Sequence, residues 1–307
     1  MSRRALVLFG VMAVIWGIPY LLIRIAVAEI SPATLVFART GIATLILLPI
    51  ALLRTDMRPV LARWRWVVAF AVAEVGGPWL LLGSAEQHVT SSLAGLLVAG
   101  VPLVGTVIAV GTGSWERIGS NAVIGLLVGL AGVAAIIGVN LGSSDTTALL
   151  EIGVVVVGYA VGPAILARRL GGLSSVGVMA LSLSLCALVY APFAAVQRPV
   201  VMPSPGALAS VAILGVVCTA AAFVLFWALI DEIGPIRATV ITYVNPAVAA
   251  LLGVAILNES FTPVMGIGFG LVILGSALAT RPQRQTPSGA TMAGESAAAE
   301  ESAEPAL

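Results

Sequence analysis

The chain has 307 residues, of which 60% are hydrophobic and only 9% are charged, and its mean hydropathy is +1.11. Because a soluble domain carries about 25% charged residues, this composition excludes a soluble globular fold and indicates a polytopic membrane protein. A bilayer core about 30 Å thick takes about 20 apolar residues per helical span, so the chain has room for about ten spans with short connections. The formal net charge of +1 gives no indication of a nucleic-acid partner.

The apolar segments, divided at charged or Gly/Pro/Ser-rich junctions, predict an all-α integral membrane protein with ten transmembrane helices. The first segment continues beyond the core of a signal peptide, about 7–15 residues, and has no small-residue cleavage site, so we expect a retained span. The predicted spans are residues 5–26, 32–53, 66–85, 90–111, 119–140, 149–167, 173–196, 207–230, 236–257 and 262–280. The polar, low-complexity tail over 281–307 predicts a disordered cytoplasmic segment.

The arginines predict the orientation, because cytoplasmic loops are enriched in basic residues. With a cytoplasmic N-terminus, twelve of the 15 basic residues, all of them arginine, lie on the cytoplasmic side, and Arg24, Arg39 and Arg198 lie on or near the far side. We therefore expect a multi-pass protein of the bacterial cell inner membrane with both termini in the cytoplasm. Trp64 and Trp66 would then lie at the inner headgroup level.

The two halves of the chain show weak internal similarity, as many transporters do. At an offset of 144 residues Pro19 corresponds to Pro163 and Pro102 to Pro246, and at an offset of 143 Glu116 corresponds to Glu259. Each half holds five predicted spans, and an odd number of spans inverts the second half relative to the first. We therefore predict two inverted five-helix repeats, 1–144 and 145–280, with a site between them.

Several stretches resemble the EamA family of ten-span carriers in the drug/metabolite transporter superfamily. They are IWGIPYLLIRIA, SPATLVFARTGIATLILLP and ERIGSNAVIGLLVGLAGV in the first half, and LIDEIGPIRATVITYVNPAVAALLGVAILNESFTPVMGIGFGLVILGSAL in the second. The resemblance covers residues 5–280. It implies two EamA repeats around a central cavity and the transport of amino acids, other small metabolites or drugs. It implies no role for Glu74, because the corresponding part of the third span is more often apolar or small in the family.

Glu74 is an acidic residue inside the apolar stretch AVAEVGGPWLL. It follows Trp66 by eight residues, which places it about 12 Å into the bilayer core, where an exposed charge costs about 2.5–3.5 kcal/mol on insertion scales. Pro78 lacks an N–H and so frees the carbonyl of residue 74, the arrangement of a broken-helix transport site. Two interpretations follow: Glu74 binds a proton or the substrate, or it bonds a neighbouring helix, for example at Arg39.

Further prolines and polar or aromatic residues are candidates for the transport path. The prolines with a predicted helix kink are Pro19, Pro78, Pro102, Pro163 and Pro246, because each removes a helical donor. Predicted cavity-lining residues, besides Glu74, are Trp16, Tyr20, Trp79, Thr219, Phe223, Tyr243 and Asn245, which suit a small amphipathic ligand. The alternative for the aromatic residues is that they fill the core or a lipid belt.

The remaining polar residues favour structural roles. We expect Arg39 to snorkel or pair near the outer third of its span, and Arg24 to screen the outer mouth or to snorkel. His88 and Glu86 belong to a solvated outer loop. The pairs Gly125-x3-Gly129 and Gly266-x3-Gly270 predict the faces on which the fifth and tenth spans pack, and Glu116 and Glu259 precede those spans as helix-start carboxylates.

The sequence contains no pattern for an enzyme, a cofactor or a metal site. It has no lysine, so no nucleotide-binding Gly-rich loop ending in Lys-Ser/Thr is present, and one histidine makes no metal centre. Cys186 and Cys218 lie in apolar segments, and we expect them to be buried thiols.

We expect a secondary transporter that exports a small metabolite such as an amino acid by alternating access. The alternatives are proton-coupled efflux of cationic drugs through Glu74, a membrane-embedded enzyme acting on lipid, and a non-transporting sensor. The expected partners are the substrate, the lipid bilayer and, in the proton-coupled alternative, protons.

Overall fold

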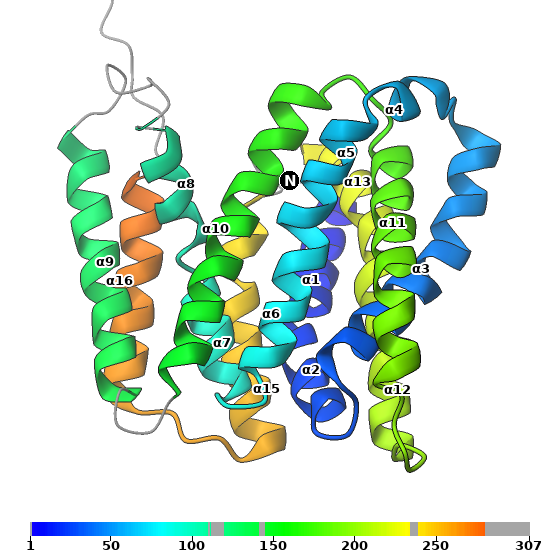
Figure 1. Cartoon of the computed structure of the whole chain (residues 1–307). Coiled ribbons are helices and arrows are strands. Elements are labelled where there is room, and N and C mark those ends of the chain that lie inside the picture. The colour runs from blue at the N-terminus through cyan, green and yellow to red at the C-terminus, as the bar shows by residue number, and fades with distance from the viewer. Residues whose placement is uncertain (1, 110, 112–119, 141–144, 234–238, 280–307) are drawn as a thin grey trace, which may run out of the picture.

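The computed structural model describes residues 2–109, 111, 120–140, 145–233 and 239–279, and over these ranges every regular element is a helix (Figure 1). The predicted all-helical fold is therefore confirmed. The tail over 281–307 and Glu116 lie outside the described residues.

The helices follow the predicted spans closely. Those of the first half are α1 (Arg3–Gly17), α2 (Pro19–Val27), α3 (Pro32–Arg54), α4 (Arg58–Ala62), α5 (Trp64–Phe70), η1 (Ala71–Gly76), α6 (Gly77–Ala85), α7 (Ser91–Val98), α8 (Val101–Ala109) and α9 (Ser120–Asn140). Those of the second half are α10 (Thr146–Arg169), α11 (Ser175–Val196), α12 (Pro205–Gly215), η4 (Val216–Ala221), α13 (Ala222–Ile233), η5 (Thr239–Tyr243), α15 (Asn245–Leu257) and α16 (Pro263–Ala279).

Within the described ranges, 7 helical segments are long and apolar enough to cross a membrane. They are Arg3–Val27, Pro32–Arg54, Trp64–Ala85, Ser91–Ile108, Thr146–Arg169, Ser175–Val196 and Pro205–Ile233. The other three predicted spans correspond to the shorter apolar helices Val123–Gly138, Ile241–Leu257 and Pro263–Leu278. The structure thus supports a multi-pass membrane protein, and ten as the number of spans stays a prediction.

Side-chain caps explain where several of these helices begin. The hydroxyls of Ser31, Thr90, Ser174 and Ser204 each accept a hydrogen bond from the backbone N–H three residues ahead, and Asp145 accepts one from Thr147. Such caps satisfy N–H groups that a helix leaves without an internal partner. The sequence pattern of a polar residue before an apolar run therefore sets these boundaries.

Two of the long segments change to a π-helix midway. The segment holding Glu74 does so at η1, and the segment holding Thr219 does so at η4, at positions 145 residues apart. At the end of η1 the N–H of Gly77 donates to the carbonyl of Val72, and the next residue is Pro78, which has no N–H to donate. π-Helical turns of this kind are frequent at functional sites.

The other prolines do not share one local geometry. Pro19 is the first residue of α2 after a break at Ile18, and Pro246 is the second residue of α15. Pro102 follows the break between α7 and α8. Pro163 lies inside α10, which continues past it as an α-helix.

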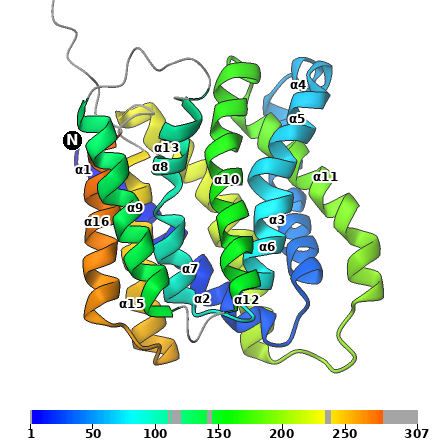
Figure 2. The ribbon, with the colours of Figure 1, turned by 60° about the vertical axis from the view of Figure 1, so that its left-hand side comes forward.

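The packing of the helices pairs segments from the two halves. Helix α3 packs on α11, α7 on α15 and α9 on α16, while α6 packs on α10, and α1 and α2 pack on α13 and α12 (Figures 1 and 2). Numbered one to ten along the chain, these segments pair as 2 with 7, 4 with 9, 5 with 10, 3 with 6 and 1 with 8. The first three pairs join equivalent segments of the two halves, and the last two pairs are equivalent to each other. These five pairings are therefore unchanged when the two halves are exchanged.

Glycines determine how closely α9 and α16 approach. A Cβ at Gly275 would meet the backbone of Gly129 and the carbonyl oxygen of Gly125, the latter at 2.5 Å. A Cβ at Gly268 would meet the Gly132 carbonyl oxygen at 2.9 Å, whereas one at Gly270 would meet nothing within 4 Å. The predicted face of Gly125 and Gly129 is confirmed. The predicted Gly266-x3-Gly270 face is wrong, because α16 turns Gly268 and Gly275 toward α9 instead.

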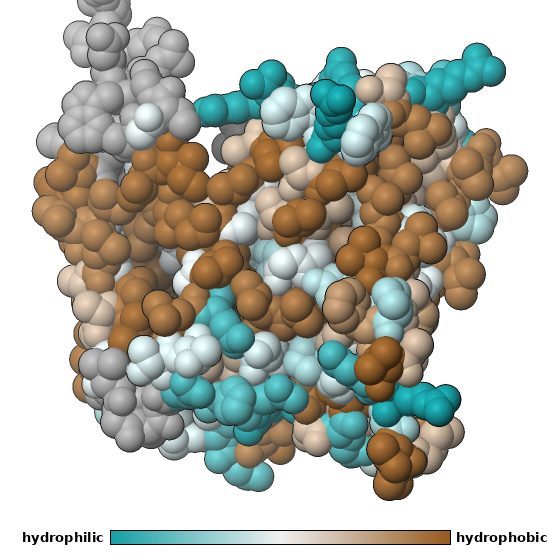
Figure 3. All heavy atoms as spheres, viewed as in Figure 1, coloured by the Kyte–Doolittle hydropathy of each residue, from teal (hydrophilic) through white to brown (hydrophobic). Residues whose placement is uncertain are grey.

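The surface has the polarity expected of a membrane protein. Hydrophobic residues gather across the middle of the face seen in Figure 3, with hydrophilic residues toward its upper and lower ends. Large apolar side chains such as Leu45, Leu53 and Leu188 are exposed, which in a bilayer places them against lipid.

Candidate functional site

Arg39 of α3 lies in the interior of the bundle, with only 7% of its surface exposed. Its Nε donates a hydrogen bond of 2.9 Å to the hydroxyl of Thr219 in η4, and that hydroxyl donates at 2.7 Å to the carbonyl of Leu214. The guanidinium carbon lies 3.6 Å from the centre of the Trp79 ring, a cation–π contact. The snorkelling position predicted for Arg39 is therefore wrong. Arg39 joins the π-helix η4 of one half to α6 of the other, and α6 directly follows the π-helix η1.

Two tyrosines belong to the same group. Tyr20 of α2 is buried, and both Tyr20 and Tyr159 of α10 lie within electrostatic range of Arg39. We name the set Arg39, Tyr20, Trp79, Tyr159 and Thr219 the central cluster. Three of its members, Tyr20, Trp79 and Thr219, are among the residues predicted to line a cavity. Arg39, to which the sequence analysis gave a structural role, and Tyr159 are additions, and a basic residue inside an apolar span is the signal that could have identified Arg39.

Glu74 faces α10. A Cβ at Gly162 would lie 2.9 Å from the Cβ and 3.1 Å from the Cδ of Glu74, so the carboxyl group packs directly on the glycine. A turn earlier, a Cβ at Gly158 would lie 2.5 Å from the carbonyl oxygen of Ala73. The pair Gly158-x3-Gly162, which the sequence analysis did not identify, is a small-residue packing face for the π-helical turn.

The carboxyl group of Glu74 has little compensation for its burial. Its Oε2 is buried and has no hydrogen-bond partner among the residues that the structure describes. No ion pair joins Glu74 to Arg39 in the described ranges. Tyr159 lies within electrostatic range of both Glu74 and Arg39. The interpretation in which Glu74 is neutralised by Arg39 is thus not what the structure contains.

The other predicted lining residues lie in two further places. Trp16 of α1 contacts aromatic rings of α13, with ring centres 6.1 Å from Phe223 and 4.6 Å from Phe226. Tyr243 and Asn245 lie at the junction of η5 and α15, where a Cβ at Gly17 would come within 3.0 Å of the Asn245 carbonyl oxygen. The structure therefore places these residues at the contacts of α1 with its neighbours.

Glu86 is a second buried acid, although the sequence suggested a solvated loop. It caps the end of α6 and is 0% exposed, while the nearby His88 is exposed as expected. Both carboxyl oxygens of Glu86 lack a partner among the described residues, and Arg24 donates to its backbone carbonyl. Burial raises the pKa of Glu86 well above its usual value, as does the charge of Glu259, and Arg24 and Arg39 oppose this. Burial therefore disfavours the charged form of Glu86.

The loops after α15 and α2, at the lower end of Figure 1, each hold an acid that bonds the start of a helix of the opposite half. Glu259, after α15, accepts hydrogen bonds of 2.8 Å from the N–H groups of Ser91 and Ser92 and one of 2.5 Å from the Ser92 hydroxyl. Glu29, after α2, accepts bonds of 2.6 Å from the N–H and hydroxyl of Ser204. Glu259 was expected at the start of the tenth span. It reaches the first turn of α7 instead, since Asn258 takes a left-handed conformation with φ of 55°.

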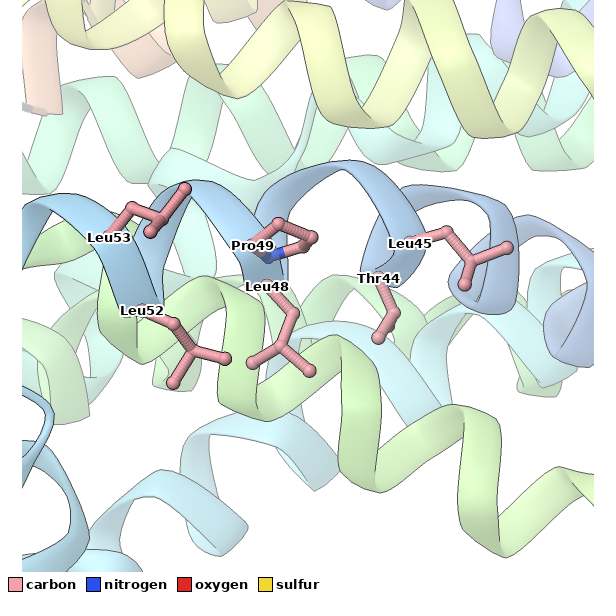
Figure 4. Close-up of a pocket in the computed structure, with 6 residues that line it drawn as sticks. All are labelled: Thr44, Leu45, Leu48, Pro49, Leu52 and Leu53. Atoms are coloured by element: carbon pink, nitrogen blue, oxygen red, sulfur yellow. The ribbon is translucent and has the colours of Figure 1, made fainter.

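A groove of about 390 Å³ lies along α3, lined by Thr44, Leu45, Leu48, Pro49, Leu52 and Leu53 (Figure 4). Five of the six side chains are apolar, and Leu45, Leu52 and Leu53 are strongly exposed. The groove lacks the converging polar groups of a ligand site, so its position fits a lipid-facing surface.

No group of three or more His, Cys, Asp or Glu residues that could hold a metal occurs in the described ranges. Cys186 and Cys218 are buried free thiols.

Comparisons with known proteins agree with this architecture. The chain is 28% identical over 286 residues to the "Uncharacterized inner membrane transporter YedA" of Escherichia coli K12, an alignment covering 91% of this chain and 92% of that protein. YedA of Escherichia coli O157:H7 matches equally. One solved crystal structure has the same fold, with a TM-score of 0.64 and 22% identity over 91% of this chain and 97% of the other. A model of the EamA-like transporter family matches residues 3–138 and 147–281, and the chain therefore belongs to that family of membrane transporters.

Proposed function

We propose that the protein is a secondary transporter that exports a small metabolite, such as an amino acid or a related amphipathic compound, by alternating access between two inverted repeats. The observation that carries this proposal is the central cluster. Its polar and aromatic groups lie inside an otherwise apolar bundle, and they come from both segments that match the family: Tyr20, Arg39 and Trp79 from the first, and Tyr159 and Thr219 from the second. A site between halves that move relative to each other is what alternating access requires.

The contact pattern of the helices supports the two-repeat part of the proposal. The five pairings between the halves described above map onto one another when the halves are exchanged, and the π-helices η1 and η4 lie 145 residues apart. Each half contributes five of the proposed spans, so the second inserts upside down. The inner membrane is the proposed location, with both termini on the cytoplasmic side.

Reconstitution into liposomes tests transport directly. Radiolabelled amino acids are loaded inside proteoliposomes and their loss is followed, beside the same compounds in protein-free liposomes. We expect saturable efflux of at least one amino acid. A double variant of the cluster, Arg39→Gln with Thr219→Val, should remove most of that flux. The proposal is contradicted if the protein causes no flux of any amino acid or related metabolite beyond that of the protein-free liposomes.

A second candidate function, proton-coupled efflux of cationic drugs, is favoured by one observation. The Oε2 of Glu74 is buried without a partner among the described residues, as expected of a carboxyl group that holds a proton in this state and releases it to bind a cation. The test compares drug efflux by the wild type and Glu74→Gln between acid and neutral pH. Efflux that depends on a pH gradient in the wild type and not in the variant supports this function. Equal, pH-independent transport by both proteins rules it out.

A further inference from the structure

No acidic side chain in the part of the chain that the structure describes forms an ion pair with Arg39, and the one described acid that acts on it electrostatically, Glu86, lies beyond ion-pair distance. No carboxylate there lies within 4.0 Å of its guanidinium, and Glu74 packs on Gly162 instead. A buried arginine in a membrane protein is costly unless it is paired, and such residues commonly mark substrate or ion pathways. The contacts of Arg39 therefore point to a partner that the chain does not provide.

The guanidinium is also held in place on two sides. Its Nε is fixed by Thr219, whose hydroxyl is fixed in turn by the carbonyl of Leu214, and one face of its plane lies against Trp79 at 3.6 Å. The two terminal nitrogens make no hydrogen bond with the described residues. Their N–H groups form a planar fork whose geometry matches the two oxygens of a carboxylate. The anchoring leaves this fork pre-positioned.

We propose that Arg39 binds the carboxylate of the transported substrate through these terminal nitrogens. This inference rests on the proposed transport function and narrows its substrate to small organic carboxylates, amino acids included. The hydroxyls of Tyr20 and Tyr159 lie nearby and provide further donors to the bound anion. The second half has Leu183 at the position 144 residues after Arg39, so it offers no second cation there. The site therefore accepts one carboxylate at a time.

The same charge argues against a purely cationic substrate in this cluster. A cation brought next to Arg39 in a site that excludes water would be repelled strongly, because the effective dielectric is low. Tyr20, Trp79 and Thr219 around Arg39 are buried and Tyr159 is half-buried, so the substrate reaches them when one side of the bundle opens. A carboxylate would then replace water around the terminal nitrogens and neutralise the site.

Ligand binding to the purified full-length protein tests the inference without transport. Melting temperature is measured with each of the twenty standard amino acids, with their amides, and with matching carboxylic acids that lack the amino group. We expect stabilisation by at least one carboxylate and none by its amide. Arg39→Gln should weaken that binding by about tenfold or more, because charge-assisted hydrogen bonds are lost. Arg39→Lys should weaken it too, since an ammonium lacks the planar fork. Thr219→Val, which retains the charge, should weaken it less.

The matched control is Arg24→Gln, which removes a second arginine near the same helices, one bonded to the carbonyl of Glu86 and not placed in the cluster. It should leave carboxylate binding unchanged. The proposal is overturned if no carboxylate stabilises the protein, if an amide binds as well as its acid, or if Arg39→Gln binds like the wild type. Flux in proteoliposomes separates the two claims. Carboxylate binding through Arg39 without flux would contradict the transport function, whereas flux of a cationic compound unaffected by Arg39→Gln would contradict the carboxylate site alone.

Discussion

Gly162 permits the position that Glu74 takes. An added methyl group would overlap the carboxyl end of Glu74, and it would leave every charge of the site in place. We expect Gly162→Ala to move the Glu74 side chain away from α10 and to lower the transport rate several-fold. The loss of stability should be about 1–3 kcal/mol, because the carboxyl end of Glu74 can shift but its Cβ, 2.9 Å from the added methyl group, moves only with the backbone.

The control is Gly153→Ala in the same helix, since a Cβ there meets nothing within 4 Å. An exposed helical glycine gains stability on replacement by alanine, by about 0.5–1 kcal/mol, so this variant should melt at or slightly above the wild-type temperature. Equal transport by the two variants would show that the position of Glu74 has no effect on transport.

Glu86 leads to a prediction about pH and stability. Its pKa is raised in the fold, chiefly by burial, so the folded chain holds a proton that the unfolded chain releases above its usual value of 4.5. The stabilising effect of that proton is present below this pH and is lost as the pH rises toward the folded pKa. Compared with Glu86→Gln, which is neutral at every pH, the wild type should therefore lose melting temperature as the pH rises.

Glu29 provides a contrast of opposite sign. The hydrogen bonds from the Ser204 side chain and backbone lower the pKa of Glu29 below its usual value of 4.5. Its contribution is present above that value and is lost as the pH falls through the folded pKa. The difference in melting temperature between the wild type and Glu29→Gln should thus shrink in acid. Parallel pH profiles for the Glu86 and Glu29 variants would contradict the environments described for both acids.

Among the elements, α9 and α16 have the contact that depends most on glycine. Gly275→Ala should separate the two helices, because its Cβ would overlap backbone atoms of Gly129, which cannot shift as a side chain does. We expect a lower melting temperature, corresponding to about 1–3 kcal/mol. Gly270→Ala is the matched control on the same helix, and it should be neutral or slightly stabilising. Thermal unfolding in one detergent compares them, and a greater loss for Gly270→Ala would favour the face predicted from the sequence.

These elements show what could be predicted from the sequence and what could not. Membrane helices are predictable because apolar length and caps such as Ser31 and Ser204 are local properties. The face of α16 is not, because glycines at 266, 268, 270 and 275 allow more than one small-residue stripe and the partner helix selects between them. The wrong prediction for Arg39 has the same cause. Its position along α3 follows from the sequence, but the direction of its side chain toward Thr219 depends on how the helices pack.

The site itself was predictable only in part. Tyr20, Trp79 and Thr219 were expected in a cavity from residue type and depth; the structure brings them close to one arginine, and their lining of a cavity stays a prediction. The packing of Glu74 on Gly162 required knowledge that the third and sixth segments are neighbours. Glu86 looked like a loop residue because it follows a helix end, yet the helices around that end bury it completely.

At the scale of the whole molecule, the loops after α2 and α15, at the lower end of Figure 1, each hold an acid that connects the two halves that separate in the proposed transport cycle. Glu259 of the second half accepts hydrogen bonds from the first turn of α7, and Glu29 of the first half accepts them from Ser204, the N-cap residue of α12. Hydrogen bonds to a charged carboxylate are stronger than those between neutral groups, although exposure to water weakens them. These contacts therefore favour the state in which this end of the bundle is closed.

Breaking both caps should increase the population of the state open at that end. Cys218 reports opening, because it is buried at 1% exposure and lies within electrostatic range of Arg39. In a Cys186→Ala background, we expect the double variant Glu29→Gln, Glu259→Gln to react about tenfold faster with a membrane-impermeant thiol reagent applied from that side. Such an increase corresponds to about 1.4 kcal/mol. Glu232→Gln is the control, since Glu232 bonds Ser2 and Arg4 at the opposite end of α1 and α13. It should not accelerate labelling from the capped side, and equal acceleration by both variants would indicate general loosening of the bundle instead of opening at one end.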